Sequence, residues 1–315
     1  MMTGSELKPG LKKFIPLVIL SAILSILVSF LATPILRVLR NVYGARAFWL
    51  SGLVLFGLVS ALQLTPVAFL VLSCWVVVGL YAELEERGHA GFWAGFLSLV
   101  VASGVLIGGT WLVTTWLGQN FVAELQSGLK STLDQLQANK PSTDAPTTLA
   151  GLEVNAAFIL SQIPSVVVLL HLMNLGFALM MDRKVALILG LPFERIALHL
   201  KPLDFRVPDG FVWLAMLSFL GTFLKLQPAV LNLIASNIFT VMMGLYLFQG
   251  LAVMELALIV FRVGAFIRFL LYFIVVGQLF FVLSAVGFAD YWIDFRKRLR
   301  NFRMKQKNSN NGEHV

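Results

Sequence analysis

One uncharged stretch limits the folds open to this chain more than any other feature of its sequence. Residues 47–82 contain no Asp, Glu, Lys or Arg over 36 consecutive positions. A helix needs about 20 apolar residues to cross the ~30 Å hydrocarbon core of a bilayer, so the stretch is too long for one span. Pro66 lies near its middle, and proline favours a turn there. The stretch therefore predicts two short membrane spans, 47–63 and 66–83, joined by a tight turn.

Apolar stretches of similar length recur along the 315-residue chain, of which 58% is hydrophobic and 13% charged. Soluble domains carry about 25% charged residues, so this composition excludes an ordinary soluble globular protein. The short alternating strands of an outer-membrane barrel, about ten residues each, are absent from the pattern. The predicted fold is all-α, a polytopic transmembrane helical bundle of about eight spans; seven spans, or six with re-entrant pieces, are the alternatives. The expected spans are 14–32, 47–63, 66–83, 91–117, 153–181, 210–226, 229–261 and 264–289.

The pattern changes between the fourth and fifth of these spans. Apolar residues recur at three- and four-residue steps from Phe121 to Leu136, with charged residues between them. This periodicity predicts an amphipathic helix lying on the membrane surface or over the bundle. Residues 139–148 form a polar, proline-containing linker. The expected organisation is an N-terminal four-span half (1–117), an amphipathic helix with its linker (118–150), a C-terminal half with a basic exit (151–307) and a disordered tail (308–315).

The net charge of +8 comes from Lys and Arg placed beside apolar helices. This placement is typical of topology signals and of attraction to anionic lipid, and it argues against nucleic-acid binding. The first apolar run is too long for a cleaved signal peptide, so we interpret it as an uncleaved helix. The N-terminal lysines and the basic C-terminus predict that both termini lie on the cytoplasmic side of the cell inner (cytoplasmic) membrane. This assignment divides the Lys and Arg residues almost evenly between the two faces, because Arg37, Arg40 and Arg46 then lie outside.

Enzyme signatures are absent from the sequence. It contains no HExxH, GxSxG, P-loop or GxGxxG motif. The single cysteine, Cys74, stands in an apolar run, so it can form neither an internal disulfide nor a Cys-rich metal site. We therefore expect no enzyme activity, no catalytic residues, no metal site and no cofactor. A membrane enzyme is the alternative, because polar residues far apart in sequence can meet in the fold.

Polar residues inside the apolar spans are the candidates for a substrate-binding site, since a charge at the bilayer centre costs at least about 2.5 kcal/mol. His171 and Asn174 are three residues apart on the fifth span, and a polar line follows the seventh span at four-residue steps. Hydrogen bonds between packed helices are the alternative role for these groups. The predicted substrate-binding residues are His171, Asn174, Asn232, Ser236, Thr240, Gln249 and Glu255.

The end of the last span carries two aspartates one helical turn apart, followed by a basic run. Asp290 precedes the aromatic residues of the exit and so lies nearer the hydrocarbon. We predict that it pairs with a basic residue or with backbone donors on a neighbouring element. Asp294 and Arg296 are expected to anchor the exit helix, and the basic run from Arg296 to Lys307 is expected to attract anionic lipid. The predicted role of Asp290, Asp294 and Arg296 is therefore structural.

Three short motifs carry a resemblance to a known family. They are Phe205-Arg206-Val207-Pro208, the pair Gln249-Gly250 in the seventh span, and the exit sequence from Gly287 to Arg298. In these motifs, and in its length and span pattern, the chain resembles the YybS-like family, a domain-of-unknown-function family of uncharacterised bacterial membrane proteins. That family is regarded as a distant relative of the S components of energy-coupling-factor transporters, which capture vitamins.

The resemblance implies a helical bundle of roughly six core spans with further ones added, and it implies no particular substrate. It favours a small-molecule binding or transport module, whose partners would be a small-molecule ligand and a membrane protein. The alternative is a non-transporting scaffold that docks anionic lipid or a cytosolic protein through its basic C-terminus. In both cases the lipid bilayer surrounds the protein.

Overall fold

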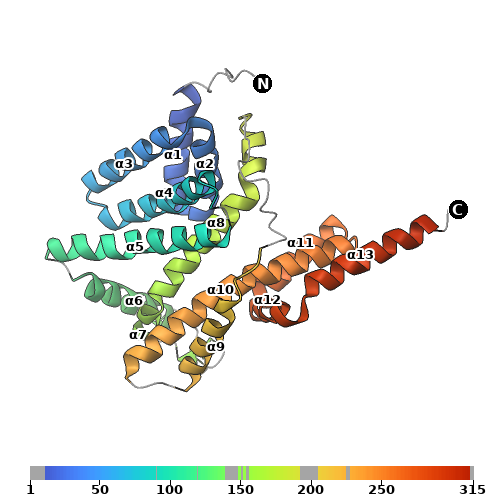
Figure 1. Ribbon diagram of the computed structural model, residues 1–315. Helices are drawn as coiled ribbons and strands as arrows, with labels where there is room; N and C mark the ends of the chain where they lie inside the picture. The colour runs from blue at the N-terminus through green and yellow to red at the C-terminus, as the bar shows by residue number, and fades with distance from the viewer. Residues whose placement is uncertain are drawn as a thin grey trace. The chain divides into compact units, whose positions relative to one another are not determined.

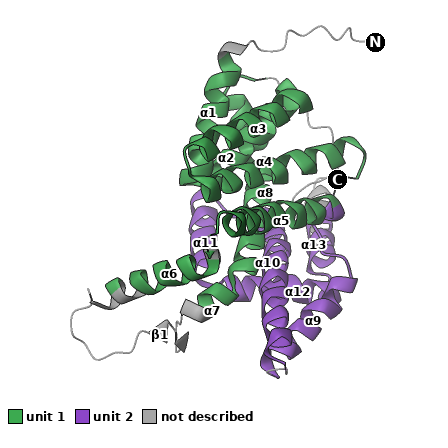
Figure 2. Cartoon of the chain, turned by 90° about the vertical axis from the view of Figure 1, so that its left-hand side faces the viewer, with its two compact units in different colours: residues 1–89, 94–196 green, residues 90–93, 197–315 purple. Residues whose placement is uncertain are grey.

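The computed structural model describes residues 11–89, 91–118, 120–138, 148–149, 152–153, 156–191, 205–224 and 228–312. Within these ranges the chain is helical, apart from loops and a small hairpin in which β1 (Thr148–Leu149) pairs antiparallel with β2 (Leu152–Glu153). The chain forms two compact units, shown in Figure 2: unit 1 contains residues 1–89 and 94–196, and unit 2 contains residues 90–93 and 197–315. This division differs from the expected boundary at 118–150, because the fifth expected span packs with the N-terminal helices. Most of the linker 139–148 lies outside the described residues.

Unit 1 holds the first eight helices. They are α1 (Leu11–Leu27), α2 (Ser29–Tyr43), α3 (Ala45–Ala61), α4 (Thr65–Glu86), α5 (Phe92–Trp116, its first two residues belonging to unit 2), α6 (Phe121–Ala138), α7 (Ala156–Ser161) and α8 (Ile163–Ile188). The uncharged stretch forms two helices as predicted. Pro66 lies in the first turn of α4, where its missing N–H has no helical partner to lose. The predicted amphipathic helix is α6.

The first expected span, 14–32, is wrong as a single helix. The chain turns at Val28 between α1 and α2, and the ring centroids of Phe14 and Tyr43 lie 4.8 Å apart. The start of α1 is therefore beside the end of α2, and the two helices form an antiparallel hairpin.

Helix α2 continues through Pro34, where the sequence predicts a helix end. Proline leaves the carbonyl oxygen of Phe30 without its usual N–H donor. The hydroxyl of Thr33 lies 3.1 Å from that oxygen and can donate to it. A threonine side chain that replaces a lost backbone donor is a common way to accommodate proline in a membrane helix.

Helices α2, α4 and α8 enclose the core of unit 1. Leu36 and Leu39 of α2 and Trp75 and Val78 of α4 are almost completely buried there. Successive contacts between α2 and α8 advance in the same direction along both helices, from the Ser29–Asn174 pair to the Arg37–Asp182 pair. The two helices therefore run parallel, and the α1–α2 turn lies at the level of Asn174, the twelfth of the 26 residues of α8.

Unit 2 is built around α10 (Ala229–Val260), which Figure 1 shows in orange beside the C-terminal helices. The other helices are α9 (Gly210–Phe223), α11 (Ala265–Gln278), α12 (Phe280–Ile293) and α13 (Phe295–Gly312). The Ser284 hydroxyl donates to the carbonyl oxygen of Met243, and Gln249 contacts Gly287 and Asp290 further along. Since both partners advance together, α12 runs parallel to α10.

Two glycines allow α10 and α12 to approach closely. A Cβ atom on Gly250 would overlap the backbone of Leu283, and one on Gly287 would overlap the carbonyl oxygen of Tyr246. A side chain larger than hydrogen at either position would push the helices apart. The Gln249-Gly250 pair and Gly287, which belong to two of the motifs noted in the sequence, thus meet at one helix crossing.

The last expected span, 264–289, consists of two helices, α11 and α12, bent by 98°. After α12 the chain breaks again at Asp294, whose backbone is left-handed (φ 51°). The expected single span over 264–289 is therefore wrong as one continuous helix. Helix α13 continues beside the end of α10, where the ring centroids of Phe261 and Phe302 lie 6.1 Å apart.

The described helices fit the predicted membrane class. Four of them, α4, α5, α8 and α10, are long and apolar enough to cross a membrane, and the bent pair α11–α12 makes a fifth candidate. Shorter apolar helices are α1, α3 and α9. Together these match the eight apolar segments that the sequence predicts. Large apolar side chains such as Phe266, Phe273 and Trp213 are exposed, as lipid-facing residues are in a membrane bundle.

Candidate functional site

Gln249 of α10 connects the three sequence motifs of unit 2. Its amide oxygen accepts a hydrogen bond from the backbone N–H of Val207 (2.9 Å). Its amide nitrogen donates to the carbonyl oxygen of Gly287 (2.9 Å) and approaches a carboxylate oxygen of Asp290 (3.4 Å). Gln249 is 1% exposed. Each of these bonds goes to the protein, so the side chain acts here as an internal clamp.

Asp290 forms the ion pair that the sequence predicts for it. Its carboxylate is buried and lies 2.7 Å from Nη2 of Arg296, the second residue of α13. Another guanidinium nitrogen of Arg296 donates to the carbonyl oxygen of Phe205 (2.8 Å). The prediction of a basic partner on a neighbouring element is confirmed. The break at Asp294 makes this geometry available, because it turns the chain so that Arg296 points back toward α12.

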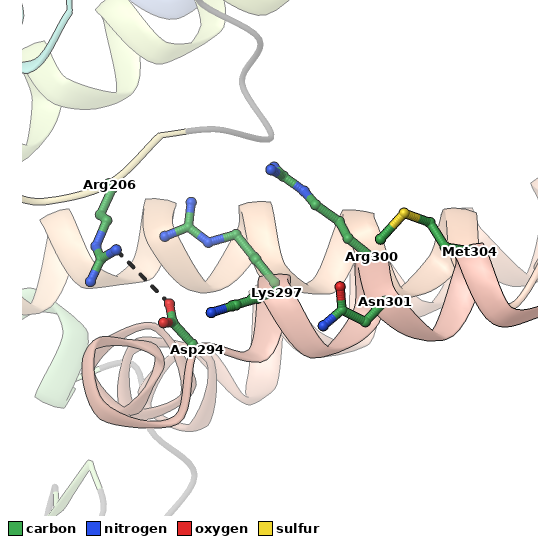
Figure 3. A pocket seen from close by; sticks show the side chains of 7 residues that line it. Arg206, Asp294, Lys297, Arg300, Asn301 and Met304 are labelled. Atoms are coloured by element: carbon green, nitrogen blue, oxygen red, sulfur yellow. Dashed lines mark ion pairs between the residues drawn. The ribbon is translucent and has the colours of Figure 1, made fainter.

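A basic groove of about 360 Å³ lies beside this pair (Figure 3). Its lining residues are Arg206, Asp294, Arg296, Lys297, Arg300, Asn301 and Met304. Arg206 comes from the segment before α9 and reaches Asp294 at 3.9 Å, whereas the remaining residues belong to α13 or to the turn before it. Four cationic side chains face one carboxylate, so the groove favours an anion.

In unit 1, the predicted residues His171 and Asn174 lie where α2 begins. The Ser29 hydroxyl donates to the amide oxygen of Asn174 (3.1 Å), and the Thr33 hydroxyl lies 2.8 Å from the Asn174 carbonyl oxygen. The amide nitrogen of Asn174 points to Sγ of Cys74 (3.9 Å). Asn174 is fully buried. The contact with α2 could not be predicted, because no local pattern indicates that the first span turns back at Val28.

His171 is one helical turn from Asn174 and is also fully buried. Its Nδ1 lies 2.9 Å from the carbonyl oxygen of Val167, so this nitrogen carries the proton of a neutral ring. Ser103 of α5 lies 3.3 Å from the same nitrogen. The other ring nitrogen, Nε2, has no hydrogen-bond partner among the described residues. It is therefore a buried acceptor with unused capacity.

A cluster of charged side chains closes the open end of the α1–α2 hairpin, and sequence reasoning missed it. Arg37 Nη2 lies 2.7 Å from a carboxylate oxygen of Glu85 on α4, and its Nε lies 3.0 Å from Asp182 on α8. Arg40, one turn further, contacts Glu83 (2.9 Å) and Glu86 (2.7 Å).

The two arginines are 1% and 2% exposed. Arg37 and Arg40 are three residues apart, and so are Glu83 and Glu86. This equal spacing is the signal that could have paired the two segments. The sequence instead suggested a loop after the first span and a charged hinge after the third.

Of the other predicted substrate-binding residues, Ser236, Thr240 and Glu255 have partners within unit 2. The hydroxyls of Ser236 and Thr240 bond to carbonyl oxygens one turn back on α10. Asn232 keeps an amide oxygen without a partner among the described residues. Glu255 pairs with Arg268 (3.2 Å) and accepts a hydrogen bond from Tyr272 (2.8 Å), both on α11. From Asn232 to Glu255 these side chains extend over about 35 Å of helix, so no single pocket collects them.

The part of the chain that the structure describes contains no group of three His, Cys, Asp or Glu side chains arranged to hold a metal ion. Unit 1 has buried polar contacts at the turn between α1 and α2, and unit 2 has a buried ion pair at the Asp294 break with a cationic groove beside it. This chemistry suits the binding of polar or anionic groups.

The fold and these sites define a multi-pass, all-helical membrane protein. More specifically, the chain belongs to the family described as "Predicted membrane protein (DUF2232)", which it matches over residues 14–291. The YybS-like resemblance is consistent with this membership. No curated protein and no solved structure matches the chain.

Proposed function

We propose that this protein is a membrane transport module in which the α1–α2 hairpin gates a site for a small polar molecule. The observation that carries the proposal is the turn at Val28, which lies beside Asn174 halfway along α8. A break in a helix within the bilayer is tolerated where the rest of the protein buries the exposed backbone groups, or where these groups line a water-filled path. Transporters often build their substrate sites at broken helices near the bilayer midplane.

The groups at this turn suit a solute that both donates and accepts hydrogen bonds. The N-terminus of α2 supplies the positive end of a helix dipole, which favours an electronegative group. Asn174 supplies an amide, and the unpartnered Nε2 of His171 supplies an acceptor one turn away. A small polar molecule with an N–H or O–H group would use these atoms. An apolar molecule would leave them unpaired.

The charged cluster at the open end of the hairpin is the proposed lock. Arg37 connects α2 to α4 and to α8 at once, through Glu85 and Asp182. Movement of the hairpin away from both α4 and α8 would break both ion pairs. Ion pairs that form in one state and open in another are a common element of conformational switching.

We further propose that both termini face the cytoplasm. In unit 1, Lys13, Arg37, Arg40 and Arg46 gather at the open end of the α1–α2 hairpin, because the two helices are antiparallel. In unit 2, the basic residues of α13 follow the C-terminal end of α10, and Arg262 lies at that end too. Each unit taken by itself therefore has one strongly basic end, which the positive-inside rule assigns to the cytoplasm.

Cysteine labelling tests this orientation. On a Cys74→Ser background, Asn120→Cys and Leu224→Cys should react with an impermeant maleimide in intact cells. Arg183→Cys and Lys305→Cys should react only in inverted vesicles. The reverse pattern would overturn the assignment.

The transport proposal is tested by what the purified protein carries. Small molecules extracted from the wild-type protein should include at least one species, seen by mass spectrometry, that is depleted in His171→Ala and Asn174→Ala. Asn237→Ala, a polar-to-alanine change on α10, is the matched control and should retain it. Absence of any such species from the wild-type protein, or equal loss in the control, would count against a binding module.

The alternative function is a non-transporting scaffold that docks lipid or a cytosolic protein. The exposed basic face of α13 and its groove favour it. An energy-coupling membrane partner would support the transport proposal, whereas a cytosolic protein bound through α13 would support the scaffold. In neither role do we propose an enzymatic activity.

A further inference from the structure

The cations of the groove in unit 2 are held in place by contacts that leave part of their charge facing outward. Arg296 is fixed by Asp290 and by the carbonyl oxygen of Phe205. Arg206 lies 3.9 Å from a carboxylate oxygen of Asp294 and 3.9 Å from one of Asp209. Lys297 is exposed and makes no ion pair with any residue that the structure describes. The lining residues Arg206, Arg296, Lys297 and Arg300 against Asp294 give the groove a net positive charge.

Two further features suit a phosphate group. The groove adjoins the first turn of α13, whose N-terminal backbone N–H groups and helix dipole favour an anion. Figure 3 shows Lys297 and Asn301 on neighbouring turns of α13, with Arg206 approaching from the opposite segment, so that donors face the groove from two elements. A tetrahedral phosphate can accept hydrogen bonds from several directions at once.

The surroundings of the groove indicate that the phosphate belongs to a lipid. Trp292, at the end of α12, is 56% exposed, and Tyr291 lies beside it with its ring 5.1 Å away. Trp and Tyr at the end of an apolar helix mark the depth of the headgroups, and Tyr291 is half-buried here. Met304 adds an exposed apolar side chain to the lining. A lipid presents its phosphate and an adjoining apolar part at this depth, whereas inorganic phosphate has no apolar part that could contact Met304.

We propose that this groove is a specific site for the headgroup of an anionic phospholipid, with Lys297 as its principal phosphate contact. The volume of about 360 Å³ lies at the lower end of the ~300–1,000 Å³ range of small-molecule sites, which fits a headgroup. The site rests on no part of the transport proposal. It gives the scaffold alternative a defined lipid ligand, and it would hold α13 against the membrane in either case.

Native mass spectrometry of the purified full-length protein tests the site. The probe is dioctanoyl phosphatidylglycerol, with dioctanoyl phosphatidylcholine as the zwitterionic comparison and inorganic phosphate as a soluble competitor. The double variant Lys297→Gln/Arg300→Gln removes two charges that line the groove. Arg303→Gln/Lys305→Gln removes two charges from exposed positions of the same helix that do not line it. Both pairs lower the net charge equally, so general attraction to anionic lipid falls equally in the two.

We expect the groove variant to bind phosphatidylglycerol about 10- to 30-fold more weakly, because it loses charge-assisted contacts to the phosphate in addition to the general attraction that both variants lose. The control variant should change less than about threefold on the same scale. Lys297→Gln alone should show an intermediate loss. Equal weakening in both double variants would overturn the proposal in favour of diffuse attraction. Equal binding of the zwitterionic lipid, or displacement by millimolar inorganic phosphate, would also overturn it, the latter indicating a site for a free phosphate compound.

Discussion

Replacing Arg37 with glutamine tests the proposed gate at its lock. Glutamine is polar but shorter than arginine, and it carries no positive charge. The carboxylates of Glu85 and Asp182 then stay behind with side-chain exposures of 5% and 0%. Neither can reach water while the hairpin is closed. The variant therefore raises the free energy of the closed arrangement far more than that of an open one.

The size of this effect follows from the burial of the pair. Removing one partner of a buried ion pair costs about 3–5 kcal/mol, because the remaining charge is left without compensation. Opening the hairpin lets water reach the two carboxylates and relieves part of that cost. A difference of 1.4 kcal/mol is a tenfold change in an equilibrium, so the open population should rise by up to about 100- to 1,000-fold. Arg40→Gln should have a weaker effect, because Glu83 and Glu86 are partly exposed.

Cys74 provides the assay, because it is the single cysteine of the chain and lies at the inner end of the hairpin. It is fully buried, so alkylation by N-ethylmaleimide in native membranes should be slow in the wild-type protein. The rate, followed as a mass increase of the intact protein, should rise strongly in Arg37→Gln. Arg183→Gln is the matched control: it removes an exposed arginine next to Asp182 and should leave the rate unchanged.

An unchanged Cys74 alkylation rate in Arg37→Gln would refute the gate. Faster alkylation together with loss of helical circular dichroism would mean general unfolding, and it would refute the gate as well. The prediction therefore requires faster alkylation in a protein whose helical content is that of the wild type.

Three further predictions concern unit 2. Gly287→Ala should destabilise the protein by about 1–3 kcal/mol, because the added methyl group overlaps the carbonyl oxygen of Tyr246, and the loss should appear as a lower unfolding temperature. Gly277→Ala is the control and should have little effect, because a Cβ atom there meets nothing within 4 Å. Gln249→Leu leaves the buried N–H of Val207 unpaired at a cost of about 1–3 kcal/mol. The segment around Val207 is then held less firmly, so trypsin should cleave after Arg206 faster than in the wild-type protein. Equal cleavage rates would contradict the clamp. Arg296→Gln should cost about 3–5 kcal/mol by leaving Asp290 unpaired, and adding Asp290→Asn should restore part of the loss; strictly additive effects would show that the two residues do not interact.

The sequence predicted the membrane class, the eight apolar segments and the amphipathic helix because these depend on local composition and periodicity. It also predicted that Asp290 needs a partner, since a carboxylate near hydrocarbon is costly without one. It did not predict which residue supplies the partner. Arg296 can turn back to Asp290 because Asp294 adopts a left-handed conformation, and nothing in the local pattern marks an aspartate for that role.

The turn at Val28 shows most clearly what local reasoning could not supply. The run from Phe14 to Ala32 carries no charged residue, so its length alone favoured one straight span. The chain turns there because α2 finds its partners on α4 and α8, at Glu85, Asp182 and Asn174, which are 48 to 145 residues away. If residues 14–32 formed one straight span, the arginines of α2 would lie on the side of the membrane opposite Lys13. The Lys and Arg residues would then be divided almost evenly between the two sides, and their count would give no clear orientation. With the turn, the arginines join Lys13 at one end of unit 1, and the charge asymmetry that orients membrane proteins becomes visible. The hydropathy pattern records only where helices are available, and it does not contain the long-range pairing of buried charges that brings α2 against α4 and α8.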